Sequence, residues 1–242
     1  MQETETRPAS ADPRAPWKQA AAEAAVALIE DNMAVGLGTG STAAFAVEAL
    51  AARVRAGLRV RAIPTSERTA LRARTAGIPL MSFAECGRLD LTIDGADEIA
   101  LGSLSLIKGL GGALLREKIV AAASDRLVII ADSSKLADRL GTNAVLPVEV
   151  VAFGWETTQA RLEALGVRPT PRRDEANRLF QTDGGNVILD CAVGAIDDPA
   201  ALDRALGLLV GVIETGLFVG MAERAIVGGP DCVRVLTRAA TA

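Results

Sequence analysis

The stretch LDLTIDGADEIALGSLSLIKGLGGALLREKIVAAASDRLVIIADSSK, residues 89–135, decides the fold. It contains three short apolar runs, Leu89–Ile93, Leu104–Ile107 and Leu127–Ala131, each followed by charged, hydroxyl or glycine residues. Short apolar runs separated by turn residues indicate buried parallel strands. Ligands of an open parallel sheet bind beyond the carboxyl ends of its strands. The stretch therefore predicts a sheet rim lined by carboxylates, lysines and glycines, suited to a small, anionic, hydroxyl-rich ligand with acid–base groups beside it.

The residues that could carry chemistry lie directly after these runs. Asp94–Asp97 follows the first run, Lys108–Gly111 follows the second, and Lys135 closes the segment after the third. A helix predicted over Ala113–Ala123 carries Glu117 between two cations. Taken singly, such residues are usually turn formers, helix caps or a solvated helix face. Because three such features follow three consecutive strands, a common site is favoured over coincidence.

A second glycine-rich segment lies nearer the N-terminus. A predicted strand, Met33–Leu37, runs into Gly38-Thr39-Gly40-Ser41-Thr42 and then into a helix predicted over Ala43–Arg55. Such a turn points backbone N–H groups at an anion. The glycine spacing matches neither the dinucleotide fingerprint nor the P-loop, and the next predicted strand, Leu58–Ile63, is followed by no carboxylate for a ribose hydroxyl. The segment predicts a phosphate loop, with an ordinary tight turn and a hydroxyl N-cap as the alternative.

Composition limits the chemistry further. The chain of 242 residues has a formal net charge of −4 and contains neither histidine nor tyrosine. Ser-His-Asp and Cys-His mechanisms and histidine metal ligation are therefore excluded, and proton transfer is left to carboxylates or lysine. Cys86, Cys191 and Cys232 are far apart and are expected to be buried small hydrophobes in a reducing cytosol. The net negative charge gives no support to a nucleic-acid surface.

The order of predicted elements divides the chain into a leader and two domains. Residues 1–15 are polar with two prolines and predict a disordered leader rather than a signal peptide. No apolar run reaches the length of a membrane span, so no membrane partner is expected. Residues 16–145 together with 219–242 predict a Rossmann-like parallel-sheet domain of the α/β class. Its remaining predicted elements are helices over Ala15–Asn32 and Glu67–Ala76 and strands over Ile78–Ser82, Ala225–Gly228 and Val233–Leu236.

Residues 146–218 predict a second, smaller α+β domain. Strands are expected over Val148–Phe153, Val167–Arg172, Leu179–Gln181, Asn186–Cys191 and Val212–Phe218, with helices over Glu156–Leu165 and Pro199–Leu209. Thr182–Gly185 is a predicted hairpin turn. The resulting order, β-α-β-β-α-β, is that of the ferredoxin-like or split βαβ unit.

Several motifs, in chain order, carry a family resemblance: GLGTGST, DGADE, KGLGGALLREK, ADSSK, LPVEV, NVILD and GLFVG. They resemble the type A ribose-5-phosphate isomerase family, and the resemblance runs from about Lys18 to the C-terminus. It implies the two-domain fold predicted above and reversible aldose–ketose isomerisation of D-ribose 5-phosphate and D-ribulose 5-phosphate in the non-oxidative pentose phosphate pathway. It also implies activity with no metal and no cofactor, a cytoplasmic location, and a homodimer or higher homo-oligomer.

The resemblance implies a role for individual residues. Glu117 matches the family's proton acceptor, which forms an enediolate by removing the C2 proton and returning it to C1. Lys108 is suited to stabilising the developing oxyanion. Asp94 is placed to handle a hydroxyl proton, including the one transferred in sugar-ring opening. The implied substrate-binding residues are Lys18, Thr39, Gly40, Ser41, Thr42, Asp94, Gly95, Ala96, Asp97, Lys108, Gly109, Leu110, Gly111 and Lys135. Leu110 stands where the family commonly has glycine, which makes the shape of this loop a question for the structure.

Two other functions occur on similar folds. A sugar-phosphate-sensing effector domain would need the phosphate loop but not Glu117, and it would normally be tethered to a DNA-binding module. The sequence shows no helix-turn-helix pattern and no basic face that would indicate such a DNA-binding module. An aminosugar-phosphate deaminase would rely on a histidine for ring opening, and this protein has none.

Overall fold

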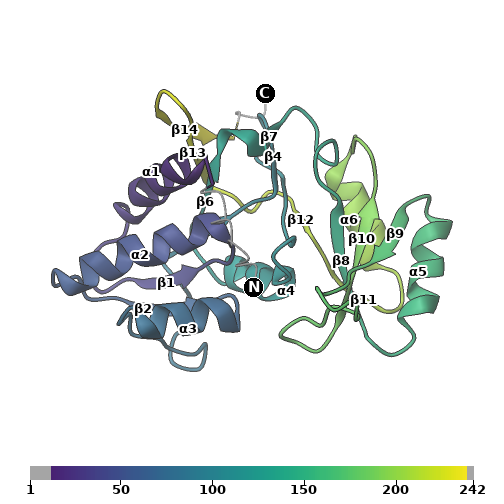
Figure 1. Ribbon diagram of the computed structural model, residues 1–242, viewed down its shortest axis with the longest axis horizontal. Coiled ribbons are helices and arrows are strands. Elements are labelled where there is room, and N and C mark those ends of the chain that lie inside the picture. The colour runs from purple at the N-terminus through teal and green to yellow at the C-terminus, as the bar shows by residue number, and fades with distance from the viewer. Residues whose placement is uncertain (1–11, 239–242) are drawn as a thin grey trace, which may run out of the picture.

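The computed structural model describes residues 12–238, which form two lobes with three sheets (Figure 1). The six strands of the large sheet, in spatial order, are β14 (Val233–Thr237), β13 (Arg224–Gly228), β6 (Leu127–Asp132), β3 (Leu91–Gly95), β1 (Ala34–Leu37) and β2 (Arg61–Pro64). All neighbours in it are parallel except β13 and β14. Because β1 pairs with β2 on one side and β3 on the other, the topological switch point lies between β1 and β3. Ligands of such sheets bind at this point.

Helices α1 (Ala15–Val26), α2 (Ser41–Arg55) and α3 (Glu67–Thr75) lie in the same lobe as the large sheet (Figure 1). The buried face of α1 consists mainly of alanines, which allow it to approach the sheet closely. At Gly228, the end of β13, an added Cβ would lie 2.0 Å from the carbonyl oxygen of Trp17. This close packing fixes the first turn of α1, which carries Lys18, above the carboxyl ends of the strands.

The first 11 residues lie outside the described part of the chain, and with them most of the predicted leader. Ala15, predicted as its last residue, already belongs to α1. This helix ends at Val26 rather than at the predicted Asn32. Asn32 itself adopts a left-handed φ of 67°, which is incompatible with a right-handed helix at that residue. The strand predicted over Ile78–Ser82 is also wrong, since only Leu80 forms a bridge, to Ala62. Pro79 lacks the N–H group that a longer ladder would require.

The four-stranded sheet lies in the other lobe. Its strands, in spatial order, are β11 (Val212–Thr215), β8 (Leu146–Val150), β10 (Val187–Ala192) and β9 (Arg168–Pro171), and its helices are α5 (Trp155–Ala164) and α6 (Pro199–Gly207). All neighbouring strands are antiparallel, and the chain runs through β8, α5, β9, β10, α6 and β11. This arrangement confirms the predicted ferredoxin-like fold. The predicted strand at residues 179–181 is reduced to two isolated bridges, at Leu179 and Gln181.

A third, small sheet joins the two lobes and was not predicted. Its strands, in spatial order, are β12 (Leu217–Phe218), β5 (Leu106–Ile107), β4 (Glu98–Ala100) and β7 (Leu136–Ala137). The second half of the run Leu104–Ile107, predicted as a parallel strand of the main sheet, is therefore β5, which pairs antiparallel with both neighbours. The strand predicted over Val212–Phe218 is split between two sheets, as β11 and β12.

Alternate residues of the small sheet face different lobes. Leu106 and Phe218 belong to the core next to the large sheet, whereas Ile107 and Leu217 belong to the core of the ferredoxin-like lobe. Side chains alternate between the two faces of a strand, so the residue after Ile107 points back toward the large sheet. That residue is Lys108, and this alternation delivers its ammonium to the carboxyl end of β3.

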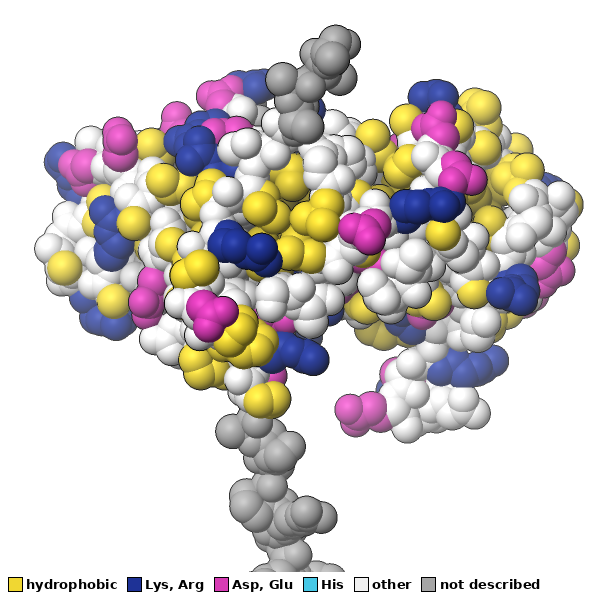
Figure 2. Space-filling model, turned by 90° about the horizontal axis from the view of Figure 1, so that it is seen from above, with side chains coloured by type: hydrophobic (Ala, Val, Ile, Leu, Met, Phe, Trp, Pro, Cys, Tyr) yellow, Lys and Arg dark blue, Asp and Glu magenta, His cyan; other side chains and the backbone are white. Residues whose placement is uncertain are grey.

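Two further features concern the surface and the helices. In the view from above, Lys and Arg side chains are interspersed with Asp and Glu rather than gathered in one area (Figure 2). Among residues 12–238, no helix is both long enough and apolar enough to cross a membrane.

Candidate active site

The loops after β1, β3 and β5 meet at the switch point and enclose a cavity of about 100 Å³. The cavity is lined by Lys18, Thr39, Gly40, Ser41, Thr42, Gly95, Ala96, Asp97, Lys108, Gly109, Gly111, Glu117 and Lys135. Every one of these residues belongs to the set predicted from the sequence. The structure therefore brings together segments up to about a hundred residues apart in the chain. Two predicted residues, Asp94 and Leu110, are not among the residues that line the cavity.

Three buried charged side chains lie at the bottom of this cavity: Lys108 and Glu117 line it, and Asp94 lies beneath them. The Lys108 Nζ lies 3.0 Å from Asp94 Oδ2 and 3.3 Å from Glu117 Oε2, and it donates a hydrogen bond of 2.7 Å to the Gly95 carbonyl. None of the three side chains is more than 4% exposed. Glu117 reaches this position from the first turn of α4 (Leu114–Ala122), which packs between β3 and the strands β8 and β11. Burial of Glu117 contradicts the solvated helix face that its flanking cations would ordinarily indicate.

Burial changes the proton affinities of all three groups. Burial, reinforced by the Asp94 charge, raises the pKa of Glu117 to about 8. Burial also raises the pKa of Asp94, although Lys108 opposes that change. Burial alone would lower the pKa of Lys108, but the carboxylates of Asp94 and Glu117 outweigh it and raise that pKa above its ordinary value. The ammonium therefore remains charged at neutral pH, while a carboxyl group beside it can take up and release a proton.

The two carboxyl groups are not equivalent. Asp94 Oδ1 accepts N–H groups from Thr39 at 3.1 Å and from Gly95 at 2.7 Å, and both bonds favour its ionised form. Glu117 Oε2 is buried, and among the described residues no donor forms a hydrogen bond with it, its approach to Lys108 being an ion pair only. One ammonium cannot fully compensate two buried carboxylates. The pKa of both carboxyl groups is therefore raised, and Glu117 is the one of the two that lines the cavity.

The structure places Asp94 beneath the residues that line the cavity, and its predicted substrate contact stays a prediction. Its side chain is 1% exposed and packs against Gly38, where an added Cβ would lie 2.0 Å from Asp94 Oδ1. A glycine is needed at this position for the carboxylate to fit. From here Asp94 can act on the ammonium of Lys108, but it has no direct access to the cavity.

The loop after β1 and the start of α2 form another part of the cavity lining. Lys18 Nζ donates to Ser41 Oγ at 3.1 Å and to Asp12 Oδ2 at 2.7 Å, so the first turn of α1 is tied to the first turn of α2. Lys135 enters from the 3-10 turn after β6. Backbone N–H groups at a helix start together with two lysines form a suitable environment for a phosphate dianion.

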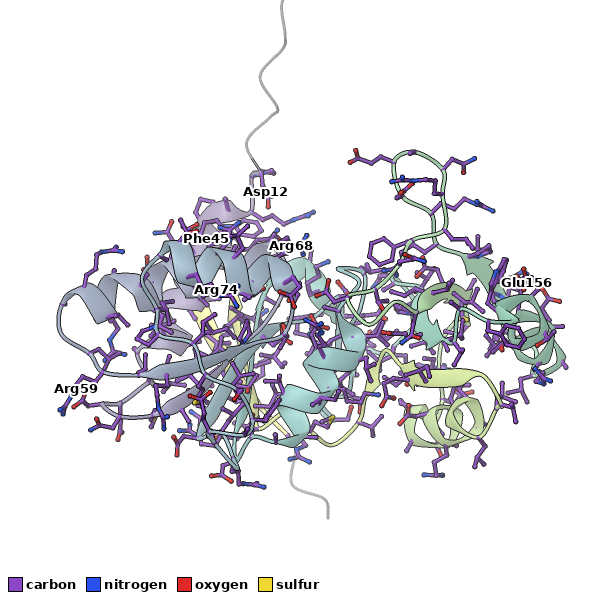
Figure 3. The ribbon with its side chains drawn as sticks, turned by 90° about the horizontal axis from the view of Figure 1, so that it is seen from below. Asp12, Phe45, Arg59, Arg68, Arg74 and Glu156 are labelled. Atoms are coloured by element: carbon purple, nitrogen blue, oxygen red, sulfur yellow. The ribbon has the colours of Figure 1, made fainter. Side chains whose placement is uncertain are left out.

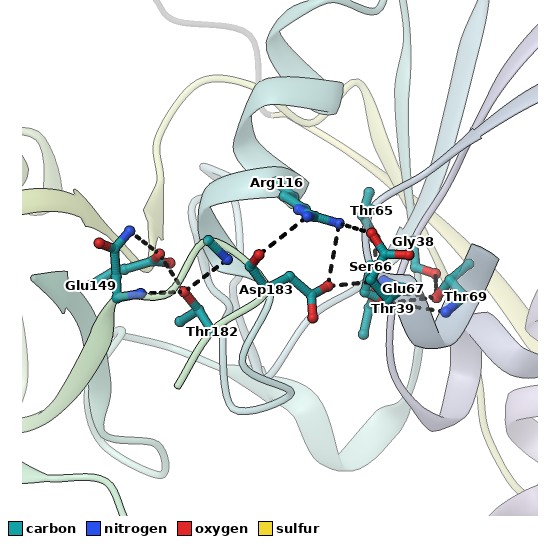
Figure 4. Close-up of polar contacts among 12 residues, drawn as sticks. Gly38, Thr39, Thr65, Ser66, Glu67, Thr69, Arg116, Glu149, Thr182 and Asp183 are labelled. Atoms are coloured by element: carbon teal, nitrogen blue, oxygen red, sulfur yellow. Dashed lines mark hydrogen bonds and ion pairs between the residues drawn. The ribbon is translucent and has the colours of Figure 1, made fainter. Parts of the chain in front are cut away.

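The Thr39 hydroxyl belongs to a cluster of hydroxyl groups behind this loop (Figure 4). Thr39 Oγ1 lies 2.8 Å from both Thr65 Oγ1 and Ser66 Oγ, and 3.2 Å from Thr69 Oγ1. Thr69 in turn donates to the Gly38 carbonyl at 3.0 Å. The side chain of Thr39 therefore holds the loop in place. Thr39 lines the cavity as predicted, but its hydroxyl group is already engaged in hydrogen bonds within the cluster.

Leu110 is accommodated by the loop without strain. Its φ is not positive, and its side chain is 45% exposed and is not among the residues that line the cavity. Its N–H donates to Asp97 Oδ2 at 2.9 Å. Gly109, with a φ of 110°, provides the left-handed turn that the loop requires. The departure from the family's usual glycine therefore leaves the backbone course of the loop intact.

Sequence reasoning missed one cation at the edge of the site. Arg68 lies on the side of its lobe that faces the ferredoxin-like lobe (Figure 3). The Arg68 Nη2 would lie 3.7 Å from a Cβ at Gly111, and with Gly40 and Arg72 this arginine lines a neighbouring cavity of about 230 Å³. Its place just after the end of β2, at the same sheet rim, is the signal that could have identified it. Among residues 12–238, no three Cys, Asp or Glu side chains are arranged to hold a metal ion.

The fold and this cavity define an α/β protein with an acid–base site for a small anionic ligand at the switch point of a Rossmann-like sheet. The sequence model of ribose 5-phosphate isomerase A (phosphoriboisomerase A) matches residues 61–232. The ribose-5-phosphate isomerase A of Gloeobacter violaceus is 60% identical over 92% of this chain and 96% of its own length. That of Thermomicrobium roseum is 53% identical over 93% of this chain and 94% of its own.

Solved structures agree with these sequence matches. Ribose 5-phosphate isomerase A from Methanocaldococcus jannaschii superposes with a TM-score of 0.89 at 36% identity, covering 93% of this chain and all of the other. The ribose 5-phosphate isomerase from Plasmodium falciparum superposes with a TM-score of 0.88 at 37% identity, covering 93% of this chain and 99% of the other. This chain belongs to the ribose 5-phosphate isomerase A family, and its activity is that of an aldose–ketose isomerase acting on a sugar phosphate.

Proposed function

We propose that Glu117 removes the C2 proton of the acyclic form of D-ribose 5-phosphate and returns it to C1 through an enediolate, while the O2 hydroxyl proton passes to O1, giving D-ribulose 5-phosphate. The observation that carries this proposal is the Glu117 carboxyl group, which is buried, faces the cavity and lies 3.3 Å from a fixed ammonium. Burial raises the pKa of this group to about 8. A positioned base is most effective when its pKa lies near the working pH, because it must both accept and return the proton.

Lys108 has the properties of an electrostatic catalyst in this proposal. The enediolate places negative charge on the C1 and C2 oxygens, and a preorganised cation stabilises such charge most where water is excluded. Asp94 maintains the charge of Lys108 and fixes its Nζ through their 3.0 Å contact. Because Asp94 does not line the cavity, we assign it this supporting role in place of the ring-opening role implied by the family resemblance.

We assign the substrate phosphate to the wall formed by Lys18, Ser41, Thr42 and Lys135. These polar side chains and this helix start line the same cavity as Glu117. One solved relative, a D-ribose-5-phosphate isomerase that is 34% identical with a TM-score of 0.89, was solved in complex with phospho-erythronic acid. A phosphorylated sugar acid combines a phosphate with a planar carboxylate resembling an enediolate, so a cavity with a phosphate wall and a cationic floor suits both groups.

The test is Glu117→Gln, which keeps the size and hydrogen bonding of the side chain but cannot accept a proton. Turnover of ribose 5-phosphate is expected to fall by at least roughly 10²-fold, the lower end for losing a positioned base. Exchange of the C2 hydrogen with solvent, followed by NMR in heavy water, should fall in parallel, while binding of ribose 5-phosphate persists. Glu163→Gln on the exposed face of α5 is the matched control and should retain wild-type turnover.

Near-wild-type turnover of Glu117→Gln would refute this assignment. A sugar-phosphate-sensing effector domain, the other function considered, would bind ribose 5-phosphate equally well in both forms and exchange no C2 hydrogen in either. The exchange measurement therefore separates the two functions directly.

The proposal extends to the organisation of the protein. We propose domain boundaries at residues 146 and 218 from the order of strands and helices. From the family resemblance we propose a cytoplasmic location and a homodimer or higher homo-oligomer, most simply a dimer. Light scattering at the assay concentration tests the dimer, and a monomeric mass would contradict it.

A further inference from the structure

The loop Lys108–Gly112, between β5 and α4, is held from outside the cavity by one side chain of the ferredoxin-like lobe. Arg172, the residue after β9, donates from Nη1 to the carbonyl of Gly109 at 2.8 Å and to the carbonyl of Leu110 at 3.2 Å. These are the two central peptides of the loop that follows Lys108. No sequence pattern indicated this contact, because residues 109 and 172 are brought together only by the packing of the lobes.

Arg172 is itself fixed in place. Asp190 on the adjacent strand β10 accepts its Nε at 2.9 Å and also its Nη2, which makes a bidentate pair. The two side chains are only 12% and 23% exposed. The guanidinium lies 5.8 Å from the centre of the Phe180 ring, and this ring occupies the space that a Cβ at Gly112 would need. Bidentate, stacked guanidinium groups have one well-defined orientation.

Peptide planarity transmits this orientation to the other side of the loop. In a trans peptide the C=O and N–H groups point in opposite directions. The Gly109 carbonyl points to Arg172, and the N–H of the same peptide, on Leu110, points the other way to Asp97 at 2.9 Å. The next peptide directs its Leu110 carbonyl to Arg172, so the Gly111 N–H faces away from Arg172. Within residues 12–238 this N–H has no hydrogen-bond acceptor, and Gly111 lines the cavity.

We propose that Arg172, fixed by Asp190, is a positioning residue of the isomerase. It orients the two central loop peptides so that the Gly111 N–H and the Lys108 ammonium are presented together to the oxygens of the sugar. The inference rests on the proposed function, since it assigns a task within the same site. It also gives the ferredoxin-like lobe a part in the reaction, although that lobe contributes no side chain to the cavity lining among the described residues.

The principal test is Arg172→Lys, which keeps the charge but loses the planar fork. One ammonium cannot hold Asp190 and two carbonyls in the same geometry. We expect kcat/KM for ribose 5-phosphate to fall roughly 10- to 100-fold, mainly through kcat, because small misplacements of reacting groups have effects of this size. Competitive inhibition by inorganic phosphate should stay within about twofold of wild type, because the phosphate wall does not touch Arg172.

Arg178→Lys is the matched control. Arg178 lies in the same lobe and pairs with Asp174, but it is 79% exposed and makes no contact with the loop, so its kinetics should not change. Arg172→Ala supplies a rescue experiment: millimolar guanidinium should restore part of its kcat, whereas ammonium at the same concentration should not. Circular dichroism establishes that each variant is folded at the assay temperature.

Three results would overturn the positioning role. One is wild-type kcat/KM for Arg172→Lys, and another is an equal loss of phosphate inhibition and of kcat. The third is failure of guanidinium to restore activity to a folded Arg172→Ala protein. Failure of the proposed function is distinguishable, because it would appear as full turnover in Glu117→Gln whatever the Arg172 variants do.

Discussion

Two clusters of charged side chains share adjacent residues of α4, Glu117 in one and Arg116 in the other, and they differ in burial. In one, Lys108 lies between Asp94 and Glu117; in the other, Arg116 lies between Glu67 and Asp183, at 2.9 and 3.4 Å (Figure 4). Side chains of the first cluster are at most 4% exposed, whereas those of the second are 34–67% exposed. Each consists of one cation and two carboxylates, so the count of charges does not distinguish them.

Burial accounts for the difference. In the Arg116 cluster, water solvates every charge, so the ion pairs are screened and contribute little. Their main structural effect is to place the hairpin turn of the ferredoxin-like lobe against the first turn of α3, where the Asp183 carboxylate accepts the Glu67 N–H at 2.9 Å. In the Lys108 cluster, desolvation dominates and moves the pKa of Glu117 to about 8. A charged cluster becomes a reactive one when its charges are removed from water together.

The largest effect is expected from deleting the cation of each cluster. Lys108→Met leaves two buried carboxyl groups without a counter-ion, so we expect unfolding free energy to fall by about 3–5 kcal/mol and turnover by at least about 100-fold. Arg116→Met should cost about 0.5–1 kcal/mol and leave turnover near wild type. Urea unfolding measures the change in unfolding free energy of each variant, and steady-state kinetics measures the change in turnover. Equal losses in the two variants would mean that burial is not what separates the clusters.

The second prediction is a pH dependence that only the buried cluster can produce. Because only the ionised Glu117 accepts a proton, kcat/KM should rise roughly tenfold per pH unit and level off above the pKa of about 8. Data are best collected above about pH 6.5, where the substrate phosphate is already doubly ionised. A flat profile through this range would contradict the raised pKa.

The same group makes stability depend on pH in the opposite direction. The pKa of Glu117 is raised from 4.5 to about 8 on folding, so the folded protein retains a proton that the unfolded state has lost. This contribution to stability is fully present below pH 4.5 and is lost as the pH rises through about 8. Glu117→Gln removes this contribution. The Tm of the variant should therefore rise relative to the Tm of wild type as the pH is raised. A constant difference in Tm across this range would refute the linkage.

A smaller effect is expected at the phosphate wall, where charges are partly exposed and no acid–base step occurs. Lys135→Ala and Thr42→Ala should each raise KM for ribose 5-phosphate roughly tenfold with kcat nearly unchanged, because phosphate contacts act equally in the ground and transition states. Thr157→Ala, at the exposed first turn of α5, is the control. A collapse of kcat at constant KM would show that this wall takes part in the chemical step.

The smallest effect concerns the exposed cluster alone. Glu67→Gln removes one ion pair of Arg116 but keeps the side-chain length, so stability should change by no more than about 0.5 kcal/mol and turnover by less than about twofold. Thermal unfolding and the standard assay are sufficient. A loss comparable to that of Glu117→Gln would make the exposed cluster part of the active site.

Local sequence patterns determined the order of elements and the candidate site. Glycines and charged residues directly after apolar runs marked the loops that meet at the switch point, and both the Rossmann-like and the ferredoxin-like folds follow from strand and helix order. Patterns were less informative where a short segment could join either of two sheets. Leu104–Ile107 was therefore assigned to the main sheet, although tertiary packing places Leu106 and Ile107 in the small sheet between the lobes.

What only the tertiary structure decided is which charges are buried and which are solvated. In the sequence, Arg116 and Glu117 are two adjacent charges of one helix; in the fold, one faces solvent and the other the cavity floor. Likewise Asp94 proves to lie beneath the cavity, and Arg172 to hold the loop after Lys108. The physical reason is that pKa values and hydrogen-bond geometry depend on desolvation and on neighbours in space. Neither of these is determined by residue type or by spacing in the sequence.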